Sequence, residues 1–128
     1  MRADQIVAMG LSQVAEGRQI FAHMSVADNI QLGAYYLAKL LRTFGGSAAL
    51  AVGAYNAGPV AMSRWLESGE TLPLDLFVAR IPYSETRTYV RRVLGNLARY
   101  QYLTSPDGAI PTLSLELPKG ARAGEDAF

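Results

Sequence analysis

Residues 47–66, SAALAVGAYNAGPVAMSRWL, decide how the rest of the chain is read. The first nine are almost all alanine, leucine, valine and glycine, so a helix built from them would be buried nearly all round. Pro59 suits the first position of a second helix, because the N–H group that proline lacks has no partner there. Tyr55 and Asn56 stand between the two helices and carry hydrogen-bonding groups to a helix end, where the backbone can turn them outward.

The segments on either side of this stretch also predict helices. The segment SVADNIQLGAYYLAKLLRTF has Ser25 and Asp28 as capping residues, apolar residues at helical spacing, and Gly45-Gly46 at its end. A short helix follows in LDLFVARI before Pro82, and a long one in ETRTYVRRVLGNLARYQYL, which Ser84 could cap. No alternating strand pattern appears before residue 110. The predicted fold class is therefore all-α.

The composition changes after the last predicted helix. The segment TSPDGAIPTLSLELPKGARAGEDAF contains three prolines and has no helical period. Its TLSLEL run alternates like a strand, but a lone strand has no partner here, so we expect a segment laid along the surface. This division predicts a domain over residues 1–104 and an extended tail over residues 105–128.

The bulk properties exclude several classes of function. A chain of 128 residues is the size of one modest domain, and a net charge of +1 does not favour binding to nucleic acid. Without cysteine, and with His23 as the sole histidine, a thiolate or histidine metal cluster is excluded. No apolar run reaches the ~20 residues of a membrane span, and the N-terminus lacks the apolar core of a signal peptide.

Three motifs carry a resemblance to a known family. They are Asn29-Ile30 with Leu32-Gly33, then the run Ala54-Tyr55-Asn56-Ala57-Gly58-Pro59, then Ile81-Pro82 with Ser84-Glu85-Thr86-Arg87 and Tyr89-Val90. In this order they resemble the C-terminal half of the catalytic (SLT) domain of the soluble lytic murein transglycosylases, over residues 1–104. The resemblance implies a lysozyme-like all-α fold, peptidoglycan glycan strands as the partner, a periplasmic or cell-envelope location, and no metal or cofactor.

The resemblance also exposes a gap. Members of the family carry a catalytic glutamate in a Glu-Ser element, followed by a Gly-Leu-Met-Gln loop, upstream of these motifs. Glu67-Ser68 is the only Glu-Ser pair here, and it follows the Tyr-Asn motif instead. Gly10-Leu11-Ser12-Gln13 is similar to the loop but too close to Asn29 for the usual layout. We therefore expect a fragment or a truncated product with no catalytic residue of its own, completed by a missing N-terminal segment.

The implied chemistry explains why this gap matters. Lytic transglycosylases are expected to use one carboxylic acid, with a pKa raised by an apolar setting, and then the sugar's own 6-hydroxyl as nucleophile. The bond between MurNAc and GlcNAc breaks to give a 1,6-anhydro end. Without the acid, this chain would bind glycan and cleave nothing. The alternative is a non-catalytic glycan-binding module or pseudoenzyme of the same fold. An unrelated helical interaction domain is disfavoured by the order of the motifs.

Three residues are the candidate substrate-binding residues. The resemblance places Tyr55 at the cleft wall, facing the reacting sugar, with Asn56 holding the loop or an N-acetyl group. From the residues alone, Tyr55 could be a core aromatic and Asn56 a helix C-cap. Glu85 resembles a cleft carboxylate that orients polar partners, but its place in the first turn of a helix explains it equally well. A solvated face is predicted for the arginines of the same helix, Arg87, Arg91 and Arg92.

The missing segment leads to an expectation about stability. Helices that should pack against it would leave apolar faces exposed, such as that of residues 48–55. We therefore expect the isolated chain to be poorly behaved, and self-association could rescue it in part.

Overall fold

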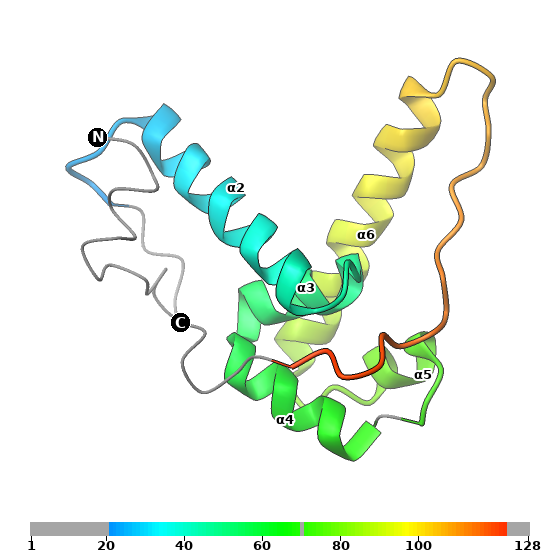
Figure 1. Cartoon of the computed structure of the whole chain (residues 1–128). Helices are drawn as coiled ribbons and strands as arrows, with labels where there is room; N and C mark the ends of the chain where they lie inside the picture. Colours follow the sequence, from blue (N-terminus) through cyan, green and yellow to red (C-terminus); the bar gives the residue numbers. More distant parts are fainter. Residues whose placement is uncertain (1–20, 70, 123–128) are drawn as a thin grey trace.

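The computed structural model describes residues 21–69 and 71–122, and it is all-α, as the sequence predicts. The helices are labelled as in Figure 1, and their bounds are Val26–Thr43 (α2), Ala48–Ala57 (α3), Pro59–Gly69 (α4), Leu74–Ala79 (α5) and Ser84–Thr104 (α6). Within the described ranges no strand occurs, and the TLSLEL run is extended without forming one. The Gly-Leu-Ser-Gln stretch at 10–13 lies outside the described residues.

Helix α3 is the centre of the fold and packs against α2, α4 and α6. Its residues 49–54 are all buried, so it is enclosed on all sides, as its composition predicts. Small side chains allow the neighbouring helices to approach closely, since a Cβ atom on Gly53 would collide with the terminal methyl of Met62 on α4. The expectation that residues 48–55 leave an exposed apolar face is therefore wrong, because α2, α4 and α6 cover it within this chain.

The exposed apolar surface lies on two diverging helices instead. In Figure 1, α2 and α6 separate from one another as they extend away from α3. Where α2 meets α3, Leu40 and Phe44 are fully buried, whereas Val26 and Ile30 at the far end of α2 are exposed. The outer half of α6 is exposed in the same way. We call the outer ends of α2 and α6, residues 26–31 and 95–104, the arms, and the part around α3 the base.

The starts of the two long helices differ from one another in how they are capped. Ser25 is the N-cap of α2, as predicted, and its hydroxyl accepts a hydrogen bond from the Asp28 N–H at 3.1 Å. For α6 the predicted cap is wrong: Ser84 is already the first helical residue, and Tyr83 occupies the N-cap position without a side-chain hydrogen bond.

After α6 the chain turns back towards the base. It runs in an extended path past α5 and ends its described part beside α4 (Figure 1). Several of its residues pack on the core, and Ala121 is buried. None of the described helices is long and apolar enough to cross a lipid bilayer.

Candidate functional site

Tyr55 lies at the C-terminal end of α3, against the middle of α2. Its ring is tilted by 52° against that of Tyr36, with 5.7 Å between the ring centroids. Its hydroxyl lies so close to α2 that a Cβ atom built on Gly33 would be 3.2 Å from the hydroxyl oxygen. The glycine of the Leu-Gly motif therefore makes room for the tyrosine of the Tyr-Asn motif.

The electrostatic setting keeps both phenols neutral. Burial raises the pKa of Tyr55 above its usual value, and the nearby Tyr89 raises it further. Burial likewise raises the pKa of Tyr36, with a second contribution from Tyr55. Both hydroxyls consequently remain available as hydrogen-bond donors beyond the pH at which an exposed tyrosine ionises.

Asn56 connects α3 to the first turn of α6. Its side-chain carbonyl accepts a hydrogen bond of 2.7 Å from the hydroxyl of Thr86, a residue that is 1% exposed. The two residues are 30 positions apart in the sequence and belong to two different motifs. This contact brings Asn56 together with the Ser-Glu-Thr-Arg turn and gives it a holding role between two helices.

Glu85 lies exposed in the first turn of α6, next to Thr86. Because Thr86 points to α3 and is buried, its neighbour is directed to a different side of the helix. Arg87, which the sequence assigns to a solvated face, is instead half-buried and donates to the backbone carbonyls of Ile81 and Pro82. This arginine fixes the turn that leads into α6, whereas the two arginines that follow at 91 and 92 are exposed as predicted.

Asn29, in the first of the three motifs, holds the turn through which the chain enters α2. Its side-chain carbonyl accepts from the Phe21 N–H at 2.9 Å, and its amide nitrogen donates to the carbonyls of Phe21 at 3.2 Å and Ser25 at 2.9 Å. An amide side chain can serve as donor and acceptor at once, which is what this turn requires. The first motif therefore has a structural role in shaping the entry to α2.

The carboxyl groups bear on what this site can do chemically. Across residues 21–69 and 71–122, every aspartate and glutamate is exposed or only partly buried. Hydrogen bonds from Ser25 hold the pKa of Asp28 below its usual range, and Ser105 does the same for Asp107. A general acid for glycoside cleavage needs the opposite, an apolar setting that raises the pKa. The described part of the chain also holds no cluster of three metal-ligating side chains.

Comparison with known proteins gives the family. The model of the transglycosylase SLT domain matches residues 5–77, which is more than half of the chain. This chain belongs to the SLT family. The matched residues contain the first two motifs, with Tyr55 and Asn56, and end before Glu85.

The curated relatives that this SLT chain matches are named as soluble lytic murein transglycosylases. The soluble lytic murein transglycosylase of Escherichia coli strain K12 is 39% identical over 95 residues, which cover 73% of this chain and 14% of the relative. The soluble lytic murein transglycosylase of Salmonella typhimurium is 39% identical over 83 residues, 64% of this chain and 13% of the relative. A putative soluble lytic murein transglycosylase of Haemophilus influenzae is 40% identical over 82 residues, 62% of this chain and 14% of the relative.

The SLT chain thus spans about a seventh of the length of these relatives. No solved structure gives a significant match. Family membership and the helical fold agree with the resemblance that the three motifs carry.

Four residues of the site were not singled out for a role from the sequence. They surround the predicted residues and are Gly33, Tyr36, Thr86 and Tyr89. Three of them lie inside the quoted motifs, so their positions in the sequence already marked them. What the sequence did not contain was the pairing between motifs, which depends on how the helices pack.

Proposed function

We propose that this chain provides one wall of the peptidoglycan-binding cleft of a lytic transglycosylase, with Tyr55, Asn56 and Glu85 as its substrate-binding residues. The observation that carries the proposal is the hydrogen bond between Asn56 and Thr86. It joins the Tyr-Asn motif to the Ser-Glu-Thr-Arg motif, so that the C-terminal end of α3 and the first turn of α6 lie next to one another. In this view the SLT domain occupies residues 1–104, and residues 105–128 are an appended segment.

The proposed reaction is the one that the resemblance to lytic transglycosylases implies. A carboxylic acid protonates the glycosidic oxygen as the bond from MurNAc C1 to that oxygen breaks. The 6-hydroxyl of the same MurNAc attacks C1 and gives its proton to the resulting carboxylate, which leaves a 1,6-anhydro end. The scheme balances without water, metal or cofactor. It differs from ordinary glycoside hydrolysis, where a second carboxylate acts as nucleophile or activates water.

The acid itself is proposed to come from a segment that completes the cleft. No carboxyl group in the described ranges sits in the buried apolar setting that would raise its pKa to the operating range. The isolated chain would then bind glycan strands of the periplasm or cell envelope without cutting them. The same observation favours the second candidate, a glycan-binding module that has no acid at all.

Tyr55 is suited to hydrogen-bond a sugar. Its ring is positioned by Tyr36, its hydroxyl by the gap at Gly33, and its raised pKa keeps the proton in place. A neutral phenol can both donate to and accept from sugar hydroxyls. Asn56 is committed to Thr86 through its carbonyl oxygen, so the amide nitrogen is the group it can offer to a ligand.

The first experiment incubates the chain with purified sacculi. We expect the protein to sediment with the sacculi, and we expect mass spectrometry to find no anhydro-muropeptides above a boiled control. Failure to sediment would overturn the glycan-binding proposal. Release of anhydro products would instead place an acid within this chain, and Glu85→Gln would be the first variant to examine.

A fusion separates the two candidate functions. The part of the Escherichia coli relative that precedes the matched region is joined to the N-terminus of this chain. If the chain is a wall of an enzyme, the fusion gains anhydro-product release that this chain lacks, and Tyr55→Phe reduces it. A binding module without catalytic use would show no gain.

A single hydroxyl tests the assignment of Tyr55. We expect Tyr55→Phe to weaken binding to glycan by about 0.5–1.5 kcal/mol, the net value of one hydrogen bond, with thermal stability nearly unchanged. Tyr100→Phe, on the exposed end of α6, makes the same chemical change away from the site. Lower stability with unaltered affinity would instead identify Tyr55 as a core residue.

A further inference from the structure

The extended segment after α6 makes its contacts with the base of the fold in its last eight described residues. We propose that residues 115–122, which we call the strap, fix the corner between α2 and α3 and thereby set the relative position of these two helices. The strap lies beyond the range that the family model matches. Its contacts reach three places on the base: α5, the α2–α3 corner and α4.

At α5, the strap supplies a missing cap. The backbone N–H of Leu74 is the first of the helix and has no partner within it, and Pro73 at the N-cap position makes no side-chain hydrogen bond. The carbonyl of Leu115 accepts from this N–H at 2.8 Å. Leu117, two residues later, packs against the core cluster.

At the α2–α3 corner, the strap touches a glycine. Gly45 has φ +61°, and a Cβ atom built on it would lie 2.6 Å from the Cβ of Pro118. Gly46, the next residue, has φ +79° and nothing within 4 Å of the same position. Gly45 is therefore required for the positive φ and also for the close approach of the strap, whereas Gly46 is required for φ alone.

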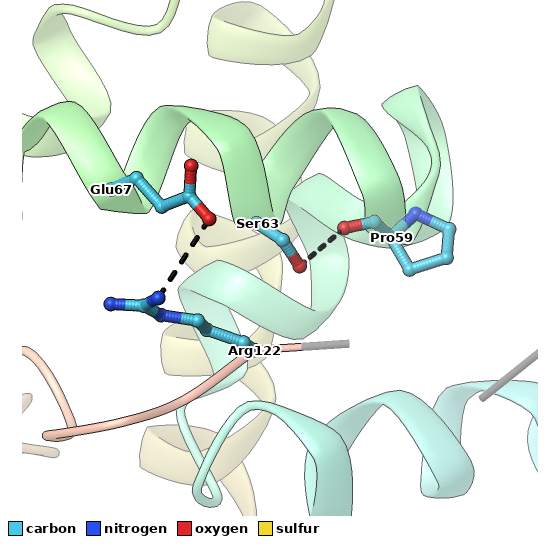
Figure 2. A network of polar contacts seen from close by, with 4 residues as sticks. All are labelled: Pro59, Ser63, Glu67 and Arg122. Carbon is cyan, nitrogen blue, oxygen red and sulfur yellow. Dashed lines mark hydrogen bonds and ion pairs between the residues drawn. The ribbon is translucent and has the colours of Figure 1, made fainter. Parts of the chain in front are cut away.

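At α4, the strap closes over the helix surface. Leu66 of α4 and the strap residues Leu117, Pro118, Gly120, Ala121 and Arg122 line a shallow cavity together. Ala121 is 8% exposed, and a charged or larger side chain there would have to leave the core. Figure 2 shows Arg122 facing Glu67 of α4, with 3.7 Å between the guanidinium and carboxylate atoms. In the same view the Ser63 hydroxyl donates a hydrogen bond of 2.8 Å to the Pro59 carbonyl, so this hydroxyl is bonded within α4 itself.

These contacts have a consequence for the site. Helix α2 carries Gly33 and Tyr36, and α3 carries Tyr55 and Asn56, so the corner that joins the helices determines how these residues meet. The strap contacts that corner at Gly45. If the proposed function holds, release of the strap would also weaken glycan binding. Docking of the strap itself can be measured without any glycan.

The test is a cycle of variants in the full chain. Gly45→Ala and Gly46→Ala both place a side chain at positive φ, but only the first meets Pro118. We expect Gly45→Ala to lower the melting temperature by roughly 3 °C or more beyond Gly46→Ala. Adding Pro118→Gly, which removes the opposing Cβ and Cγ atoms, should abolish that difference. The same difference in both backgrounds, or no difference in either, would overturn the proposal.

A second measurement decides the matter if Gly45→Ala does not fold. Ala121→Asp puts a charge in the buried end of the strap, and Thr112→Asp puts the same charge on the exposed segment before it. Hydrogen exchange of the Leu74 amide should be about 2- to 10-fold faster in the first variant and unchanged in the second, because one backbone hydrogen bond is lost. Equal exchange in the two variants would show that the strap is not docked on the base, and would overturn the proposal. Neither readout depends on glycan, so failure of the proposed function leaves this test intact.

Discussion

The base and the arms share the same two helices, but apolar side chains are buried at the base and exposed on the arms. On α2, Leu40 is fully buried at the base, whereas Ile30 is 67% exposed on the arm. On α6, Val90 is fully buried at the base, whereas Leu103 is 76% exposed on the arm. The difference comes from α3, which packs against both helices and on α2 extends to Gly33, beside the Tyr55 hydroxyl, but does not cover the exposed ends.

Helical periodicity predicts which face of a helix is apolar, but it does not predict whether other helices cover that face. Positions 26, 30, 33, 37 and 40 follow one another at spacings of three and four residues, so a single stripe runs along α2. The stripe is core at one end and surface at the other. Stability should therefore be concentrated at the base, and the exposed apolar side chains of the arms should tolerate substitution.

The largest expected effect contrasts the two ends of α2. Leu40→Ala removes a fully buried side chain and should lower the free energy of unfolding by about 2–5 kcal/mol, through lost burial and the cavity that remains. Ile30→Ala, on the same stripe of the arm, should change it by no more than about 0.5 kcal/mol. Denaturant unfolding of the two variants measures both values. Similar losses for the two would mean that the arm is covered in solution and that the contrast does not hold.

A smaller effect is expected at the polar link of the base. Thr86→Val keeps the shape of a buried residue but removes the hydroxyl that donates to Asn56, leaving the amide carbonyl without this partner. We expect a loss of about 1–3 kcal/mol in the free energy of unfolding. Thr88→Val, at an exposed position of the same helix, is the matched control. A neutral Thr86→Val would indicate that the two motifs are joined by packing alone.

Local signals predicted most of the helical fold. Ser25 and Gly45-Gly46 bound α2, and Pro59 and Gly69 bound α4, because capping and termination depend on a few neighbouring residues. Burial of α3 also follows from its composition. The start of α6 was missed by one residue, since serine at a first turn is compatible with the N-cap or the first helical position.

The features that the sequence did not predict are contacts between distant segments. The composition of α3 does not indicate which helices cover it, and the role of Arg87 depends on carbonyls that only the folded turn presents. The link between Asn56 and Thr86 spans 30 residues and leaves no periodic signal. The strap is the clearest case. Its composition indicates an irregular tail, and nothing in a run of prolines and glycines tells that Ala121 is buried.

The smallest expected effect concerns the ion pair that ties the strap to α4. The side chains of Arg122 and Glu67 are 50% and 59% exposed and 3.7 Å apart, so water screens their attraction and each loses side-chain entropy in holding it. Glu67→Gln keeps the size of the side chain and removes its charge. We expect it to cost at most about 0.2–1 kcal/mol of unfolding free energy, and less as the salt concentration rises. If the strap is held mainly by apolar contact and close packing, this loss stays well below that of Ala121→Asp in the same denaturation assay. An ion-pair variant as damaging as the buried charge would mean that the strap is attached electrostatically, so that added salt would release it from the base.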